Sequence, residues 1–291
     1  MRIFTLGRSL LLGALVLAGV AAPAFAQDGM PEGVTLEVFA NGIAASVPQE
    51  ASQILLLEVG WQPEATWPVT PDAQAVALVA VRTGELTGTL DTDIEIGRHD
   101  AAPGQTEEVA AKSAFTLAEG DSALVPAGAV GELKAGDAAT SALLFVAAPA
   151  MRDNGDDMAD MPEGVTVTPL AAGDTPKLDG PALIWLGQFT LKPGAAFPGQ
   201  AQPGAELGAG TAGEFTMKTT GGPGVVVLKD FATAAAKGEQ PEVTETKVGD
   251  TVTFGPGDAV FFPDGNTVDI SNEGDTDAIT LFGGIGPLPA E

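Results

Sequence analysis

Short apolar runs alternate with clusters of Gly, Pro, Asp and Asn along most of the chain. Runs such as Gln53–Val59, Ala75–Arg82 and Leu183–Leu191 predict strands, because they are short, aliphatic and bounded by turn residues. Further strands are predicted at Ser113–Leu117, Ser122–Val125, Ala142–Val146, Glu214–Thr219, Val225–Leu228, Glu242–Lys247, Thr251–Phe254, Ala259–Phe262 and Ala278–Phe282. One Ala-rich stretch, Phe231–Lys237, favours a short helix. Without alternation of strands and helices, the pattern predicts an all-β protein.

The composition agrees with this pattern. The 291 residues include 38 Gly and 22 Pro, which shorten helices and supply many turns. Hydrophobic residues make up 45% of the chain, enough for a folded core.

Three landmarks occur twice in the same order, which indicates an internal repeat. Met30-Pro31-Glu32-Gly33-Val34-Thr35 recurs as Met161-Pro162-Glu163-Gly164-Val165-Thr166. Pro63 and Pro68 match Pro193 and Pro198, and Gly120-Asp121 matches Gly257-Asp258. We therefore predict two similar domains, at residues 28–150 and 161–291, joined by an acidic linker at residues 151–160. These two segments are called the first and second repeat below.

The N-terminal residues 1–26 have the pattern of a secretory signal peptide. Arg2 and Arg8 are basic, Leu10–Ala22 is apolar, and Ala24-Phe25-Ala26 is a cleavage signal before Gln27. We expect a secreted protein, extracellular or periplasmic, that has no membrane attachment after cleavage.

Charge and rare residues narrow the possible functions. The chain has 13 Lys and Arg against 39 Asp and Glu, a formal net charge of −26, which argues against a nucleic-acid partner or an anionic membrane surface. No Cys is present, so disulfides and thiolate sites are excluded. The one His, His99, is expected to be a solvated loop residue.

The second repeat carries a spaced set of residues that resembles the two sequence motifs of the cupin superfamily. The set is Gly194, Gln200, Gln202, Glu206 and Gly213, followed by Gly257, Pro263, Gly265, Val268 and Asn272. The first repeat has an eroded version at Glu64, Thr70, Asp72, Ala77 and Gly84, followed by Gly120, Pro126, Gly128, Gly131 and Ala135. The resemblance implies two tandem cupin-like jelly-roll β-barrels, a bicupin.

The resemblance also implies which residues have replaced the metal ligands of cupins. Three His and one Glu bind the metal in that superfamily. Their positions here hold Gln200, Gln202, Glu206 and Val268 in the second repeat, and Thr70, Asp72, Ala77 and Gly131 in the first. Amide oxygens bind transition metals weakly and Val cannot bind them at all. We therefore expect no metal and no cofactor.

Gln200, Gln202 and Glu206 form the candidate ligand-binding site. If their strand positions are kept, their side chains point into the second barrel and need polar partners there. Trp61, Trp67, Phe189 and Phe197 are located in matching regions around the first motif of each repeat. They are read as core packing at the barrel mouths, with ligand stacking as the alternative.

The leading functional prediction is an exported protein that is not an enzyme. It would bind a small polar ligand or have a structural role, with no catalytic residue. One alternative is a metal-independent enzyme that uses Glu206 as general acid or base. Another is an interaction module whose barrels pack into a homo-oligomer.

Overall fold

A computed structural model describes residues 30–47, 52–70, 74–101, 105–149, 161–175, 178, 180–199, 201–202 and 204–288. The predicted signal peptide, the linker at residues 151–160, Gln200 and Asp72 lie outside the described residues.

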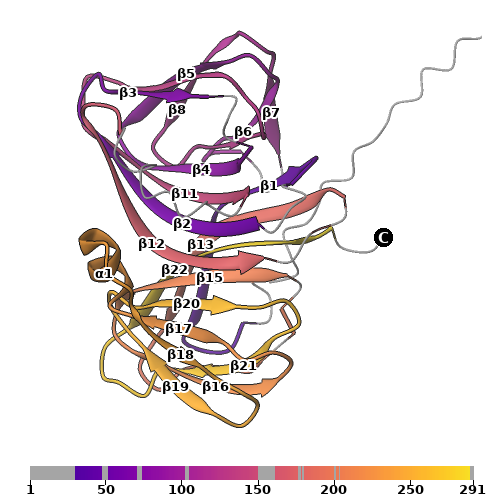
Figure 1. The fold of residues 1–291 in the computed structure, drawn as a ribbon, viewed down its shortest axis with the longest axis vertical. Coiled ribbons are helices and arrows are strands. Elements are labelled where there is room, and N and C mark those ends of the chain that lie inside the picture. Colours follow the sequence, from indigo (N-terminus) through magenta and orange to yellow (C-terminus); the bar gives the residue numbers. More distant parts are fainter. Residues whose placement is uncertain are drawn as a thin grey trace, which may run out of the picture.

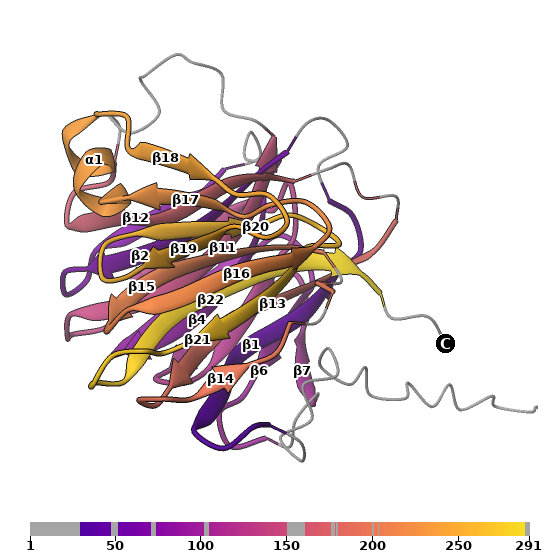
Figure 2. The same cartoon turned by 90° about the horizontal axis from the view of Figure 1, so that it is seen from below.

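Strands dominate the structure, so the all-β prediction is confirmed. Those of the first repeat are β1 (Val34–Ala44), β2 (Ser52–Trp61), β3 (Thr66–Val69), β4 (Val76–Thr83), β5 (Glu85–Leu90), β6 (Ile94–Gly97), β7 (Thr106–Val109), β8 (Ala114–Ala118), β9 (Ser122–Val125), β10 (Gly131–Ala135) and β11 (Thr140–Pro149). Those of the second are β12 (Val165–Thr175), β13 (Ala182–Leu191), β14 (Ala196–Phe197), β15 (Ala205–Ala212), β16 (Phe215–Gly221), β17 (Val226–Lys229), β18 (Glu242–Glu245), β19 (Thr251–Phe254), β20 (Ala259–Phe262), β21 (Thr267–Ser271) and β22 (Ala278–Pro287). The predicted helix is present as α1 (Phe231–Lys237) and lies beside β12 (Figure 2).

The strands form two barrels, stacked as in Figure 1, and each barrel consists of two antiparallel sheets. In the first barrel, a seven-stranded sheet of order β12-β2-β11-β4-β9-β6-β7 is combined with a four-stranded sheet of order β3-β10-β5-β8. In the second barrel, the orders are β1-β13-β22-β15-β20-β17-β18 and β14-β21-β16-β19. The two barrels therefore repeat one architecture.

The two repeats exchange their first strands. β1 precedes the first barrel in sequence but pairs with β13, so that Val34 lies opposite Leu191 in the second barrel. Correspondingly, β12 pairs with β2, and Val165 lies opposite Trp61 in the first barrel. The sequence repeats at residues 28–150 and 161–291 therefore do not coincide with the two barrels, because each repeat contributes its first strand to the other barrel.

The inner strands of the seven-stranded sheets are buried on both faces. Along β4, Val76, Leu78 and Ala80 belong to a core between the barrels, whereas the alternating Val79 and Val81 belong to the core of the first barrel. Side chains alternate between the faces of a strand, so a sheet covered on both faces needs apolar residues at every position. This explains why these strands appear in the sequence as continuous apolar runs.

Of the predicted strands, Ser122–Val125, Thr251–Phe254 and Ala259–Phe262 match β9, β19 and β20 at both ends. The pattern missed β1, β12 and β15, among others. β15 is composed largely of Ala and Gly, which weakens any strand signal. Close packing accounts for this composition: a Cβ at Gly208 would lie 2.8 Å from Val260 Cγ1.

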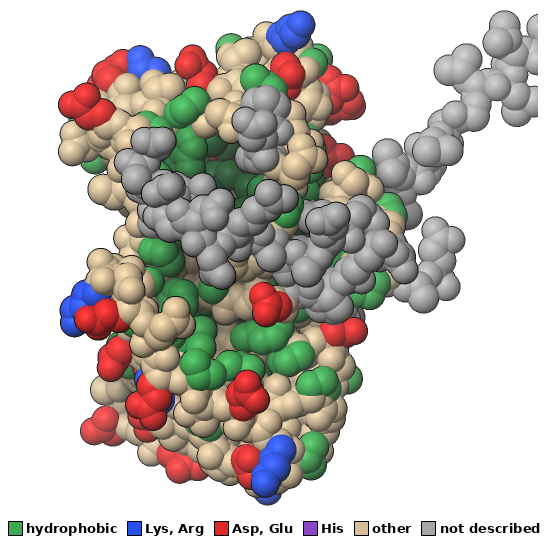
Figure 3. Space-filling view, in the orientation of Figure 1, with side chains coloured by type: hydrophobic (Ala, Val, Ile, Leu, Met, Phe, Trp, Pro, Cys, Tyr) green, Lys and Arg blue, Asp and Glu red, His purple; other side chains and the backbone are tan. Residues whose placement is uncertain are grey.

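Acidic side chains are prominent on the surface in Figure 3, in keeping with the net charge of −26. Within the described ranges, no helix has the length and apolar character needed to cross a membrane.

Candidate functional site

The site is built on β15, which lies between β20 and β22 in the second barrel. Glu206 pairs with Phe262 on one side and with Gly284 on the other. Its neighbours Ala205 and Leu207 point into the core between the barrels. By strand alternation the Glu206 side chain therefore points into the second barrel, as the sequence predicted.

Trp185 on β13 holds the Glu206 carboxyl in place. Its indole Nε1 donates a hydrogen bond of 3.0 Å to Glu206 Oε2. β22 separates the two strands, and its residue Gly284 is opposite both Trp185 and Glu206. A Cβ at Gly284 would lie 2.8 Å from Trp185 Nε1, so the absence of a side chain lets the indole reach across β22.

Burial raises the pKa of Glu206 to about 7, and the hydrogen bond from Trp185 offsets only part of this effect. The carboxyl lies deep in the barrel, yet it borders a cavity and keeps some accessible surface. Near neutral pH the side chain can therefore change between its protonated and ionised states. It can accept a hydrogen bond in one state and donate one in the other.

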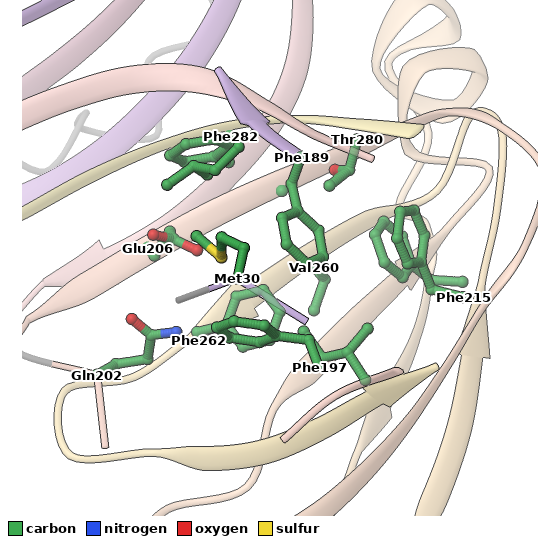
Figure 4. Close-up of a pocket in the computed structure, with 14 residues that line it drawn as sticks. Met30, Phe189, Phe197, Gln202, Glu206, Phe215, Val260, Phe262, Thr280 and Phe282 are labelled. Carbon is green, nitrogen blue, oxygen red and sulfur yellow. The ribbon is translucent and has the colours of Figure 1, made fainter. Parts of the chain in front are cut away.

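A cavity of about 60 Å³ lies next to this carboxyl (Figure 4). Its walls are largely apolar and aromatic. The lining residues are Met30, Leu36, Phe189, Phe197, Gln202, Glu206, Gly208, Phe215, Phe254, Val260, Phe262, Ile270, Thr280 and Phe282. The Thr280 hydroxyl donates a hydrogen bond of 3.0 Å to the Ala209 carbonyl, so its proton is already used within the protein. Glu206 and Gln202 therefore supply the polar side-chain groups that are most available to a ligand.

Gln202 reaches this cavity from the segment that precedes β15. Its backbone N–H donates to the Asn266 carbonyl at 2.9 Å, and its carbonyl accepts from the Gly265 N–H at 3.1 Å. These bonds fasten the segment to the turn between β20 and β21. Glu206 and Gln202 thus line one cavity, while the third candidate, Gln200, is outside the described residues; their role as a ligand site stays a prediction.

The aromatic residues of the two repeats differ in their surroundings, and ligand stacking stays a prediction. Phe189 and Phe197 line the cavity, with ring centroids 5.6 Å apart, and Phe189 is 6.2 Å from Phe215. In the first barrel, Trp61 and Trp67 have centroids 6.0 Å apart and belong to the core.

Sequence reasoning missed Met30, Trp185, Phe262 and Phe282 as members of the site. Strand alternation would have placed Phe262 correctly once Glu206 was paired with it. Trp185 and Met30 carried no such signal, because they enter from β13 and from the exchanged end of the first repeat.

The residues around Glu206 do not fit the metal that the resemblance implies. Val268 belongs to the apolar core of the second barrel. The cavity has one carboxyl and one amide among its lining side chains, and no imidazole. Across the part of the chain that the structure describes, no group of three or more His, Cys, Asp or Glu could hold a metal ion. The absence of metal remains a prediction, which elemental analysis would test.

Of the corresponding positions in the first barrel, Asp72 is outside the described residues, and the other three place no metal ligand inside the barrel. Thr70 is exposed, and Ala77 faces an apolar interior. At Gly131 a Cβ would overlap the backbone oxygen of Thr89, so a His side chain could not be placed there without moving the strand.

No family model and no curated protein sequence matches this chain. Among solved structures, it is similar to oxalate decarboxylase from Bacillus subtilis. A structure whose title concerns Mn(II) centers has 11% identity and a TM-score of 0.44, covering 90% of this chain and 79% of that one. A mutant has 11% identity and a TM-score of 0.43, covering 84% and 76%. The structure at pH 4.6 has 12% identity and a TM-score of 0.40, covering 82% and 68%.

The described sheets form two tandem barrels, which is the arrangement that the predicted resemblance to cupins implies, so the predicted fold is confirmed. The similar structures are those of a decarboxylase, against the prediction that this chain is not an enzyme, and that prediction is withdrawn. A likeness at this identity and TM-score carries no activity over to this chain, so any activity has to be argued from its own site.

Proposed function

We propose that the second barrel binds a small organic molecule in the cavity beside Glu206. The observation that carries the proposal is a cavity with six Phe residues in its wall and one deeply placed carboxyl. The sequence predicted a small polar ligand. The apolar wall favours instead a molecule with an apolar body and one polar group.

The position of Glu206 supports a binding role. Its Oε2 accepts the Trp185 indole N–H, and the carboxyl borders the cavity. A carboxyl in apolar surroundings is unfavourable without partners. A ligand donor at Oε1 would relieve this cost.

Thermal-shift screening of the mature chain against small alcohols, amides, amines and acids tests the proposal. We expect at least one compound to raise the melting temperature in a saturable way. Glu206→Gln should reduce its affinity roughly 5- to 150-fold, the effect of losing one hydrogen-bonding partner. Glu58→Gln, at an exposed residue of β2, is the matched control. Equal binding by wild type and Glu206→Gln would refute the assignment.

A second candidate function is proton-transfer catalysis by Glu206. It is favoured by the pKa of about 7 beside a cavity, because a general acid or base works best near the pH of operation. Proton exchange from a bound weak carbon acid, followed by NMR in deuterated buffer, would detect this activity. It should disappear in Glu206→Gln while binding of a neutral ligand persists.

We also propose that the protein is exported. The support is the signal-peptide pattern that ends at Ala26. N-terminal sequencing of protein from a secreting culture should start at Gln27.

A further inference from the structure

We propose that the ligand of this pocket is a small organic ammonium ion, held between the Glu206 carboxylate and the surrounding Phe rings. This inference rests on the proposed function and specifies its ligand class. It follows from the charge, the aromatic character and the size of the cavity.

Charge provides the first argument. An ionised carboxylate accepts hydrogen bonds and donates none, and Oε2 is already occupied by the Trp185 N–H. The remaining acceptor, Oε1, suits an N⁺–H donor. Among the cavity-lining residues Glu206 is the one charged group, and the wall contains no Lys, Arg or His that could bind an anion. With a net charge of −26, the protein as a whole also attracts cations.

The aromatic wall provides the second argument. Phe189, Phe197, Phe215, Phe254, Phe262 and Phe282 all line the cavity. A cation within about 6 Å of a ring centroid is attracted by the negative face of the ring. The six rings line one cavity of about 60 Å³, so they make up much of the wall that an occupant meets. An aliphatic wall would remove water equally well but would not attract charge.

The size of the cavity limits the ligand to a few non-hydrogen atoms. Methylammonium, ethylammonium and trimethylammonium fit this limit and keep an N–H donor. Tetramethylammonium has the charge without the donor, so it separates the ring contribution from the hydrogen bond.

Isothermal titration of the mature chain with ethylammonium, propan-1-ol and propionate at pH 8 tests the inference. The three probes are close in size but are cationic, neutral and anionic. We expect ethylammonium to bind at least tenfold more tightly than propan-1-ol, since hydrogen bonds between charged groups are about twice as strong as neutral ones. Propionate should not bind.

The pH dependence gives a second readout. An alkylammonium ion keeps its charge up to about pH 9, as a Lys side chain does. The partner that titrates is therefore Glu206, which faces Phe262 of β20, Phe282 of β22 and Trp185 of β13, together with Met30 and Gln202. None of these five neighbours titrates in this range. Ethylammonium affinity should rise up to tenfold per pH unit below pH 7 and level off above it.

Two variants separate the contributions. Glu206→Gln keeps the shape of the side chain but removes its charge, and it should weaken ethylammonium roughly 10- to 150-fold while leaving propan-1-ol within a few-fold. Phe197→Leu, at a half-buried position, keeps an apolar wall without the ring. It should weaken ammonium probes about 2- to 30-fold and propan-1-ol less. Circular dichroism confirms that each variant is folded.

The outcomes are distinguishable. If propan-1-ol binds as tightly as ethylammonium, or if propionate binds better as the pH falls, the ammonium assignment is wrong and the proposed pocket stands. If none of the three probes binds to wild type, to Glu206→Gln or to Phe197→Leu, the proposed function fails as well.

Discussion

The two barrels share the arrangement of their sheets and differ in the side chains at their centres. Asp121 of the first barrel accepts hydrogen bonds from Arg98 and from the His99 and Ala118 N–H groups. Asp258 of the second barrel has the same arrangement with Lys229 and with the Asp230 and Gly255 N–H groups. Burial opposes ionisation at both sites, but the hydrogen bonds and the cation hold the pKa of each Asp below its usual value.

The difference lies in three adjacent positions of the seven-stranded sheets. In the second barrel they are Trp185, Gly284 and Glu206, on β13, β22 and β15. In the first barrel the same register holds Leu55, Val146 and Ala77. One barrel therefore has a carboxyl held by an indole beside a cavity, and the other has aliphatic side chains. The comparison shows that a duplicated fold can keep its turns and lose or gain a polar site by local exchange.

The largest expected effect comes from placing a carboxyl at Ala77, the position of the first barrel that is equivalent to Glu206. Ala77→Glu should destabilise the protein by about 3–5 kcal/mol at pH 8, because the side chain would be directed at the apolar core that contains Val79 and Leu144. Chemical denaturation at pH 8 and pH 5 measures this cost, which should shrink at pH 5 where the carboxyl is protonated.

Ala77→Leu is the control for this experiment, since it adds volume without charge. Its cost should be the same at both pH values. If Ala77→Glu were tolerated at pH 8, the first barrel would hold an unrecognised polar partner, and the contrast between the barrels would be weaker than the register indicates.

A smaller effect is expected from removing the charge of Glu206. Its pKa rises from 4.5 to about 7 on folding, so the folded state retains a proton that the unfolded state loses between these values. Stability is therefore lost as the pH rises through this range, by roughly 2–3 kcal/mol between pH 5 and pH 8. Glu206→Gln has no proton to lose, so it should gain this amount over wild type across the same range.

Denaturation of both proteins at several pH values checks this linkage, with Glu58→Gln as the exposed control. Parallel stability curves for wild type and Glu206→Gln would mean that the Glu206 carboxyl is solvated, against the burial that the structure shows.

The repeats and their turns could be predicted from sequence, because Gly, Pro and Asp mark the ends of short apolar runs. The placement of Glu206 in the second barrel followed from motif spacing. The Phe-rich wall did not, since Phe262 and Phe282 look like ordinary core residues until their strands are paired. Trp185 could be recognised as the partner of Glu206 only with the register across Gly284 in hand.

Strand exchange could not be predicted either. The repeated Met-Pro-Glu-Gly-Val-Thr segment was recognised as a landmark of duplication, but no local signal shows which barrel it enters. Partner choice is decided by sheet pairing far along the chain, where Val34 meets Leu191 and Val165 meets Trp61.

The smallest expected effect tests that exchange. Met30 packs against the core of the second barrel, and its counterpart Met161 packs against that of the first. Met30→Ala should cost only about 1 kcal/mol, because the side chain is half-buried. The loss should appear as faster hydrogen exchange in β13 and β15, whereas Met161→Ala should affect β2 and β4.

Each methionine variant is the control for the other, as the two substitutions are identical and their segments repeat. Met30 also lines the cavity, so Met30→Ala should open the space beside Glu206 and admit larger ammonium probes, and Met161→Ala should not. If Met30→Ala instead raised exchange in β2 and β4 alone, the first repeat would be closing its own barrel. In the exchanged arrangement the second barrel takes Met30 from the first repeat, so the ligand site is incomplete without both repeats. A second repeat expressed alone should therefore bind any ligand more weakly than the full chain.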